Sequence, residues 1–391
     1  MYTLMNKDRK LLDFKIQGTG NMEYCDPVKQ YEAFPFWIND INQWLTNRGA
    51  AKHRQHINDI LEKCGGKTPS GFIRLTHCLS LNDTLWVKND REHLKWADVS
   101  LYTRPFNEII SKLSFDGNGL YGEQMSTTSP ELTTEGSFDK CWVREGETVI
   151  LMKAGSAGAD NAGMEPYSEV LASAVYESLC NGVKYTLGRY RGKTVSRCEL
   201  FTDEAWGFKP ASVCGMSGTP LPLLLKEYAK YGDEDLFRRM IAADAVTVNP
   251  DRHYGNFGFL ICNDTFEKIK MAPVFDYNLA MAPYADWREG FLDMDGWIRK
   301  RGPVFGGSYY EAAKSMMTPG IRSELVHLKD LELEIPTDQK FTKERLEIMN
   351  RFKNIQIDRL LGGRRQFGFG DIRQKYEMSG NELFHCKEIK K

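Results

Sequence analysis

Three side chains suited to acid–base or metal chemistry lie close together in the sequence NPDRHYGN at residues 249–256. An aspartate in such a loop can orient an attacking hydroxyl and accept its proton, and an asparagine five positions later can reach a metal ion that bridges nucleotide phosphates. Asp251 and His253 are therefore candidate catalytic residues, and Asn256 is a candidate metal ligand. His253 would support the loop or the charge of the transition state. The pattern is typical of phosphoryl transfer.

A second acid, Asp276, follows a predicted β-hairpin. Residues 257–262 are apolar and favour a strand, the Asn-Asp pair after them favours a turn, and residues 266–275 favour a return strand. A hairpin of this kind would leave Asn256 and Asp276 side by side at its open end, where an amide oxygen and a carboxylate suit Mg²⁺. The alternative is a surface loop with a helix-capping aspartate, followed by an ordinary hairpin.

The order Asp-Arg-His-x-x-Asn, then a hairpin and a second Asp, resembles the catalytic core of HipA-like serine/threonine kinases and is similar to that of phosphoinositide 3- and 4-kinases. The match covers about residues 115–362 and is strongest in the loop. Ordinary protein kinases have His-Arg-Asp and follow the second Asp with Phe-Gly, whereas this chain has Tyr277-Asn278, which disfavours a standard eukaryotic kinase. The resemblance implies ATP and Mg²⁺ as cofactors, a Ser/Thr hydroxyl of a protein as acceptor, and a toxin role with an antitoxin or other regulatory protein as partner.

Residues 148–153 form a predicted strand that ends in Lys153, and in a nucleotide site this ammonium would meet the α and β phosphates. Alone, such a lysine would be an ordinary edge residue. The resemblance places the phosphate loop just before this strand, at Gly136 and Ser137, although Gly136 is the only glycine of that loop.

A predicted helix over residues 165–179, with Pro in its first turn, occupies the position of the kinase αC helix. Glu169 is the expected partner of Lys153. Both Glu165 and Glu169 could instead be surface acids that a helix dipole favours.

Predicted strands at residues 184–190 and 195–201 lead to a hinge, where backbone groups near Glu199 and Phe201 could hydrogen-bond an adenine. A helical apolar face then precedes the catalytic loop and anchors Asp251. Further helices are expected near the following residues: 309–317, 322–328 and 343–361.

Together with these patterns, the resemblance implies an α+β, bilobal protein-kinase-like fold with a small β-rich N-lobe, a helical C-lobe and an N-terminal helical extension. The expected boundaries are 1–110 for the partly helical extension, 115–200 for the N-lobe, 204–362 for the C-lobe and 363–391 for a polar tail. In the extension, residues 36–45 and 57–64 each show a helical apolar face, and the two helices should pack on each other. The extension is then either a cap on the kinase core or a partner-binding module. The GxGxxG match at 117–122 indicates a linker, because no helix follows it.

Composition limits the possible partners and location. The 391 residues include 52 basic and 53 acidic ones, for a net charge of −1, so no overall field favours nucleic acid or an anionic membrane. The nine cysteines lack CxxC or paired Cys/His spacing, which favours reduced thiols in a cytoplasmic protein. We expect a soluble chain, since there is neither a signal-peptide pattern nor a span of 18 apolar residues.

Two other functions stay open. A phosphoinositide-type lipid kinase would share the loop, but residues 284–299 carry four acidic against two basic side chains, which disfavours membrane contact. A catalytically silent pseudokinase that acts as an interaction module is the non-enzyme alternative, although such proteins usually lose a Lys or metal acid and none is lost here.

The resemblance also implies a regulatory modification ahead of the phosphate loop. Thr133 and Thr134 are the candidate autophosphorylation sites, and phosphate there would repel ATP phosphates or capture a nearby lysine. The alternative is that the two threonines only favour a β-edge and cap the turn.

Overall fold

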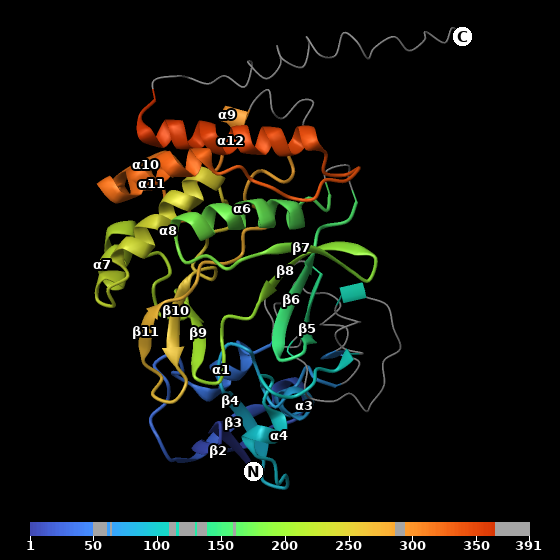
Figure 1. The fold of residues 1–391 in the computed structure, drawn as a ribbon. Helices are drawn as coiled ribbons and strands as arrows, with labels where there is room; N and C mark the ends of the chain where they lie inside the picture. The colour runs from blue at the N-terminus through green and yellow to red at the C-terminus, as the bar shows by residue number, and fades with distance from the viewer. Residues whose placement is uncertain are drawn as a thin grey trace.

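The computed structural model describes the fold as a mixed α/β arrangement of antiparallel sheets and helices, which confirms the α+β class (Figure 1). The described residues are 1–49, 61–62, 65–108, 115–116, 130, 139–158, 162–285 and 294–363.

The N-terminal region contains a four-stranded antiparallel sheet in the order β3-β2-β1-β4. Its strands are β1 (Tyr2–Asn6), β2 (Arg9–Gln17), β3 (Tyr24–Gln30) and β4 (Leu85–Asn89). Short helices accompany it: η1 (Gly20–Met22), α1 (Ile41–Thr46), α3 (Pro69–Thr76) and α4 (Trp96–Val99).

The N-terminal extension was predicted to be helical. That prediction was wrong, because the main element of the region is a four-stranded sheet. From Leu12 to Lys15, the buried side chains of Leu12 and Phe14 alternate with those of Asp13 and Lys15, which are not buried, and this two-residue period indicates a strand. The pairing of β1 with β4 joins residues more than 75 positions apart, which no local pattern reveals.

The first expected N-terminal helix is shorter than predicted. α1 begins only at Ile41, because the Asp40 side chain accepts a hydrogen bond from Gln43 N and caps the helix there. The second expected helix, at residues 57–64, lies outside the described residues except for 61–62.

A second four-stranded antiparallel sheet has the order β5-β6-β8-β7, with bounds β5 (Lys140–Glu145), β6 (Thr148–Ala154), β7 (Thr186–Tyr190) and β8 (Lys193–Glu199). Helix α6 (Glu165–Leu179) packs on β6, β7 and β8 and also contacts the helices beyond, so most of its residues are buried. Figure 1 shows α6 lying between this sheet and the helical part. The strands and the helix predicted in this stretch are all present.

A third antiparallel sheet has the order β11-β10-β9, from β9 (Trp206–Pro210), β10 (Gly258–Cys262) and β11 (Lys268–Met271). The predicted hairpin is thus confirmed, with a shorter return strand than residues 266–275. Its ladder ends soon after β11, because the Val274 N–H donates to the Asn181 carbonyl (2.9 Å) and does not continue the pairing with β10. β9 joins the hairpin from a distant part of the sequence and extends it on the side away from β11.

The helical part surrounds α8 (Glu234–Thr247), which packs against several other helices and ends two residues before Asn249. The remaining helices are α7 (Leu221–Ala229), α9 (Met294–Arg299), α10 (Tyr309–Met316), α11 (Pro319–Asp330) and α12 (Lys343–Leu361). The largest hydrophobic cluster runs from α6 through α8 to α12 and includes the base of the hairpin. Within the described part of the chain, no helix is long and apolar enough to cross a membrane.

Candidate functional site

The loop after α8 is held in shape by hydrogen bonds within itself. Asp251 N donates to Asn249 Oδ1 (3.1 Å), and Asn256 Nδ2 donates to the Asp251 carbonyl (2.8 Å). His253 lies 55% exposed, its Nδ1 accepts from Gly255 N (3.0 Å), and its Nε2 is 3.9 Å from Asp251 Oδ1. The three predicted loop residues therefore share one turn, with His253 on the solvent side of Asp251.

Lys153 joins two acidic residues from distant parts of the chain. Its Nζ lies 2.5 Å from Glu169 Oε1 on α6 and 2.8 Å from Asp276 Oδ1 after the hairpin. Glu169 is fully buried, and it also accepts hydrogen bonds from Ser196 Oγ (2.5 Å) and Tyr277 N (3.2 Å). The expected Lys153–Glu169 pair thus forms, and Asp276 belongs to the same cluster.

The two aspartates of the site differ in their protonation behaviour. Burial, together with the negative charge of Asp276, raises the pKa of Asp251 above its ordinary value. Burial also raises the pKa of Asp276, but the charges of Lys153 and Lys140 more than offset this and lower it overall. Two nearby carboxyl groups with pKa values moved apart are typical of acid–base sites, with Asp276 the more firmly ionised.

Asn256 and Asp276 have the donor types for a divalent cation. Because Asn256 Nδ2 is bound to the Asp251 carbonyl, its Oδ1 points away from that bond. Lys153 contacts one oxygen of Asp276, and within the described residues neither Asn256 Oδ1 nor Asp276 Oδ2 makes a hydrogen bond. Over the same residues, no group of three or more His, Cys, Asp or Glu side chains could hold a metal. The amide oxygen of Asn256 and the second carboxylate oxygen of Asp276 are donor types that suit an ion such as Mg²⁺, which takes few protein oxygens and the rest from phosphate and water.

Arg252 was not predicted as a site residue, although it lies inside the motif. It is 1% exposed, and its Nη1 donates both to the Asn256 carbonyl (2.6 Å) and to the Phe275 carbonyl (2.7 Å). One guanidinium thus joins the two ends of the hairpin, beside Asn256 and Asp276. The sequence offered one indication of this role, because Arg252 lies between the candidate residues Asp251 and His253. A guanidinium group can bind two acceptors at once.

Buried side chains from three helices support that arginine. Arg252 Nε donates to Asp244 Oδ1 of α8 (3.1 Å), and Tyr176 OH of α6 donates to the same oxygen. Asn249 Nδ2 donates to Tyr176 OH (3.3 Å), and the Asn249 carbonyl accepts from Tyr309 OH of α10 (3.0 Å). The loop is therefore fixed from behind by a polar network that local sequence patterns did not reveal.

The predicted hinge lies between β8 and β9. Glu199 ends β8 and is exposed, and Phe201 is half-buried with its ring 5.7 Å from that of Phe208 and 5.6 Å from that of Phe275. Because Phe275 directly precedes Asp276, the hinge and the candidate metal ligand share one aromatic wall. We call these three rings the Phe201–Phe208–Phe275 wall.

Glu165 is buried and does not pair with Lys153. Its Oε1 accepts hydrogen bonds from Ser156 N (3.1 Å) and from Tyr284 OH (2.6 Å). The idea that Glu165 or Glu169 is a surface acid was wrong for both, since each is at most 1% exposed. Glu165 instead links the segment after Lys153 to the segment after Asp276.

Four predicted residues lie outside the described part of the chain. They are the phosphate-loop residues Gly136 and Ser137 and the modification candidates Thr133 and Thr134. Their roles stay predictions.

The solved structures to which this fold is similar include the following two. One is the crystal structure of a Helicobacter pylori proinflammatory kinase, CtkA, with 20% identity and a TM-score of 0.44 over 61% of this chain and 95% of that chain. The other is the toxin–antitoxin system of HipA, HipB and operator DNA from Shewanella oneidensis MR-1, with 11% identity and a TM-score of 0.46 over 96% of this chain and 99% of that chain. No family model and no curated protein matches the sequence.

Proposed function

We propose that this chain is a kinase that uses ATP and Mg²⁺ to phosphorylate a Ser or Thr hydroxyl of a protein. The observation that carries the proposal is the convergence of Lys153 with Glu169 and Asp276, beside the loop that bears Asp251 and Asn256. These residues come from a strand, a helix, a loop and the end of a hairpin, and a positioned ammonium beside acid and amide oxygens suits the binding of nucleotide phosphates and a metal ion.

Lys153 is the proposed phosphate contact. Glu169 is buried and bound to Ser196 and to the backbone of Tyr277, so it holds the ammonium at a fixed place. A positioned ammonium can bind the α and β phosphates of a nucleotide. Asn256 and Asp276 would hold the metal ion, which supplies charge neutralisation on those phosphates.

Asp251 is the proposed base or orienting group for the acceptor hydroxyl. Its raised pKa brings it nearer to the operating pH, which favours proton transfer. His253 lies on the exposed side of Asp251, where it supports the loop or the charge of the transferring group. The roles proposed for Asp251 and His253 use side chains of one loop, and hydrogen bonds within that loop hold it in shape.

The proposal includes a bilobal arrangement around the hinge. The β5-β6-β8-β7 sheet and α6 would be the N-lobe, and the helices after the hinge would be the C-lobe. Backbone groups near Glu199 and Phe201 would bind the adenine, with the Phe201–Phe208–Phe275 wall beside it. The proposal also includes a cytoplasmic location, which the cysteine pattern favours, and a regulatory protein partner such as an antitoxin, which the resemblance of the loop motif implies.

The test is a transfer assay with purified protein, γ-labelled ATP and Mg²⁺. One arm contains a cell extract and the other contains vesicles with phosphoinositides. We expect label on Ser or Thr of proteins in the first arm and its loss when Mg²⁺ is chelated. Label only in lipid would support the lipid-kinase alternative, and tight ATP binding with no transfer in either arm would support the pseudokinase alternative. Absence of both binding and transfer would contradict the proposal.

A further inference from the structure

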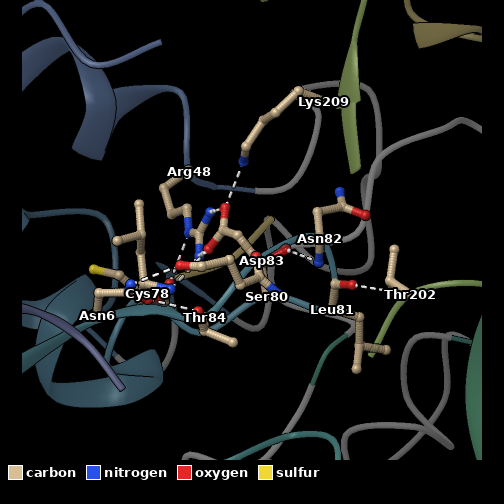
Figure 2. Close-up of polar contacts among 12 residues, drawn as sticks. Asn6, Arg48, Cys78, Ser80, Leu81, Asn82, Asp83, Thr84, Thr202 and Lys209 are labelled. Carbon is tan, nitrogen blue, oxygen red and sulfur yellow. Dashed lines mark hydrogen bonds and ion pairs between the residues drawn. The ribbon is translucent and has the colours of Figure 1, made fainter. Parts of the chain in front are cut away.

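Three consecutive residues of the N-terminal region, 81–83, contact the hinge and β9. The Leu81 carbonyl accepts from Thr202 Oγ1 (2.5 Å), and the Asn82 carbonyl accepts from Phe208 N (2.8 Å). Asp83 Oδ2 accepts from Lys209 Nζ (2.5 Å). Figure 2 shows the Thr202 and Lys209 contacts in one view, with the two side chains reaching the same short segment from different sides.

The Asp83 contact is part of a buried ion triad. Arg48 binds both carboxylate oxygens of Asp83, at 2.6 and 2.7 Å, and also donates to the carbonyls of Cys78 and Leu85 (Figure 2). None of the three charged side chains of the triad is more than 8% exposed. Two cations share one acid, so loss of that carboxylate would leave two buried positive charges together. The buried ion pair with Asp83 therefore fixes the position of the Lys209 side chain.

β9 connects this triad to the candidate nucleotide site. Neighbouring residues of a strand point to opposite faces of the sheet. Lys209 therefore points towards Asp83, while Phe208 points towards Phe201. Phe208 lies 5.2 Å from Phe275, ring to ring, and Asp276 follows directly. A shift of β9 relative to residues 81–83 would therefore move both the wall and the candidate metal ligand.

We propose that residues 81–83 position the hinge and the Phe201–Phe208–Phe275 wall for nucleotide binding, with Asp83, Lys209 and Thr202 as positioning residues. The inference rests on the proposed function and assigns the N-terminal region a role in it. The N-terminal region then stabilises the geometry of the nucleotide site through its contacts with the hinge and β9, and it does not touch the nucleotide itself.

Thr202→Val is the main test variant because it removes one donor and keeps the side-chain shape. The Leu81 carbonyl still accepts from Tyr102 OH (2.9 Å), so no buried carbonyl is left without a partner. Thr202→Ser restores the donor. Lys7→Ala is the matched control, since Lys7 joins the N-terminal region to Asp264 at the hairpin tip (2.8 Å) without touching residues 81–83.

The kinetic arm measures KM for ATP and kcat separately, with melting temperature alongside. We expect Thr202→Val to raise KM for ATP by roughly two- to ten-fold, the range of one hydrogen bond, with kcat within about two-fold and little change in melting temperature. Thr202→Ser and Lys7→Ala should match the parent. An unchanged KM in Thr202→Val, or an equal rise in Thr202→Ser or Lys7→Ala, would overturn the inference.

The second arm measures hydrogen–deuterium exchange without nucleotide and therefore does not depend on the proposed function. Asp83→Asn and Thr202→Val should both speed exchange at residues 203–210 and also at 272–276, whereas Lys7→Ala should not. Faster exchange confined to residues 203–210 would contradict transmission to the wall. A parent protein that binds no ATP would remove the proposed function, and the exchange result would still decide whether residues 81–83 position the wall.

Discussion

Asp276 combines an uncommon backbone conformation with a central position in the charge cluster. Its φ of 62° lies in the left-handed region, which aspartate and asparagine tolerate better than most residues. Tyr185 OH accepts from its backbone N–H (3.4 Å), and the next N–H is bound by Glu169. Asp276 thus has a strained backbone that hydrogen bonds hold in place, and its carboxylate pairs with Lys153. Such a combination is typical of a functional position.

If Asp276 is a metal ligand as proposed, Asp276→Asn should keep the fold and weaken the binding of Mg²⁺. Asparagine adopts a positive φ readily, so the backbone is preserved, but the anionic ligand is removed. Calorimetry of ATP binding with and without Mg²⁺ measures the effect, and we expect Mg²⁺ to strengthen binding much less than in the parent. If the metal strengthens binding equally in both proteins, Asp276 is not a ligand.

Asp251→Asn tests the acid–base role. The substitution keeps the size of the side chain and removes the proton acceptor, so ATP binding should persist while transfer falls by about 10²- to 10⁴-fold. The assay is the rate of label transfer at saturating ATP. Near-normal turnover in this variant would end the assignment of Asp251.

At the scale of elements, the loop and the hairpin are joined to α6, α8 and α10 by one polar network. Arg252 is its centre, because it connects Asp244 of α8 to the carbonyls at both ends of the hairpin. Burial raises the pKa of Asp244, and the positive charge of Arg252 only partly offsets this. The network therefore depends on each partner staying in place.

Arg252→Met should destabilise the protein by about 3–5 kcal/mol, because it leaves Asp244 buried without its cation. The double variant Arg252→Met/Asp244→Leu should recover part of that loss, since no buried charge remains. Neither variant should recover transfer activity, as both lack the bonds to the Asn256 and Phe275 carbonyls. Urea unfolding and the transfer assay together test this, and full activity in the double variant would show that Arg252 does not position the loop.

At the scale of the whole molecule, the N-terminal region is joined to the rest of the chain by a dense set of polar contacts. Asn6 Nδ2 donates to the Asn263 carbonyl (2.7 Å), Glu204 accepts from Trp96 Nε1 (2.9 Å), and the buried triad adds Lys209. In Figure 1 both central sheets lie between the N-terminal sheet and the helices. The region thus lies at one end of the molecule, and it is joined to β9, to the segment before β9 and to the turn of the hairpin.

The triad should also give the protein an acid-sensitive stability. Burial alone would raise the pKa of Asp83, but Arg48 and Lys209 more than reverse this and hold it well below its usual range. A depressed carboxyl pKa contributes stability that is present above the unfolded value of about 3.9 and is lost as pH falls below it. The stability difference between the parent and Asp83→Asn should be constant above about pH 5 and shrink at lower pH. A difference that does not change with pH would contradict the ionised triad.

The local elements that carry the candidate site residues could be predicted from the sequence. The loop with Asp251 and Asn256, the hairpin to Asp276, the strand ending at Lys153 and the helix with Glu169 all follow from short-range periodicity and residue type, and the structure contains each of these elements. These features are local, so hydrophobic period and turn residues are enough to indicate them.

Only the tertiary structure decided how those elements meet. The N-terminal sheet, the addition of β9 to the hairpin, the position of Arg252 and the triad of Asp83 all depend on residues far apart in the chain. A buried charge looks the same in the sequence as an exposed one, because its partner is fixed by packing and not by spacing. The sequence alone thus indicates which groups could carry out phosphoryl transfer, and long-range packing determines how they are held.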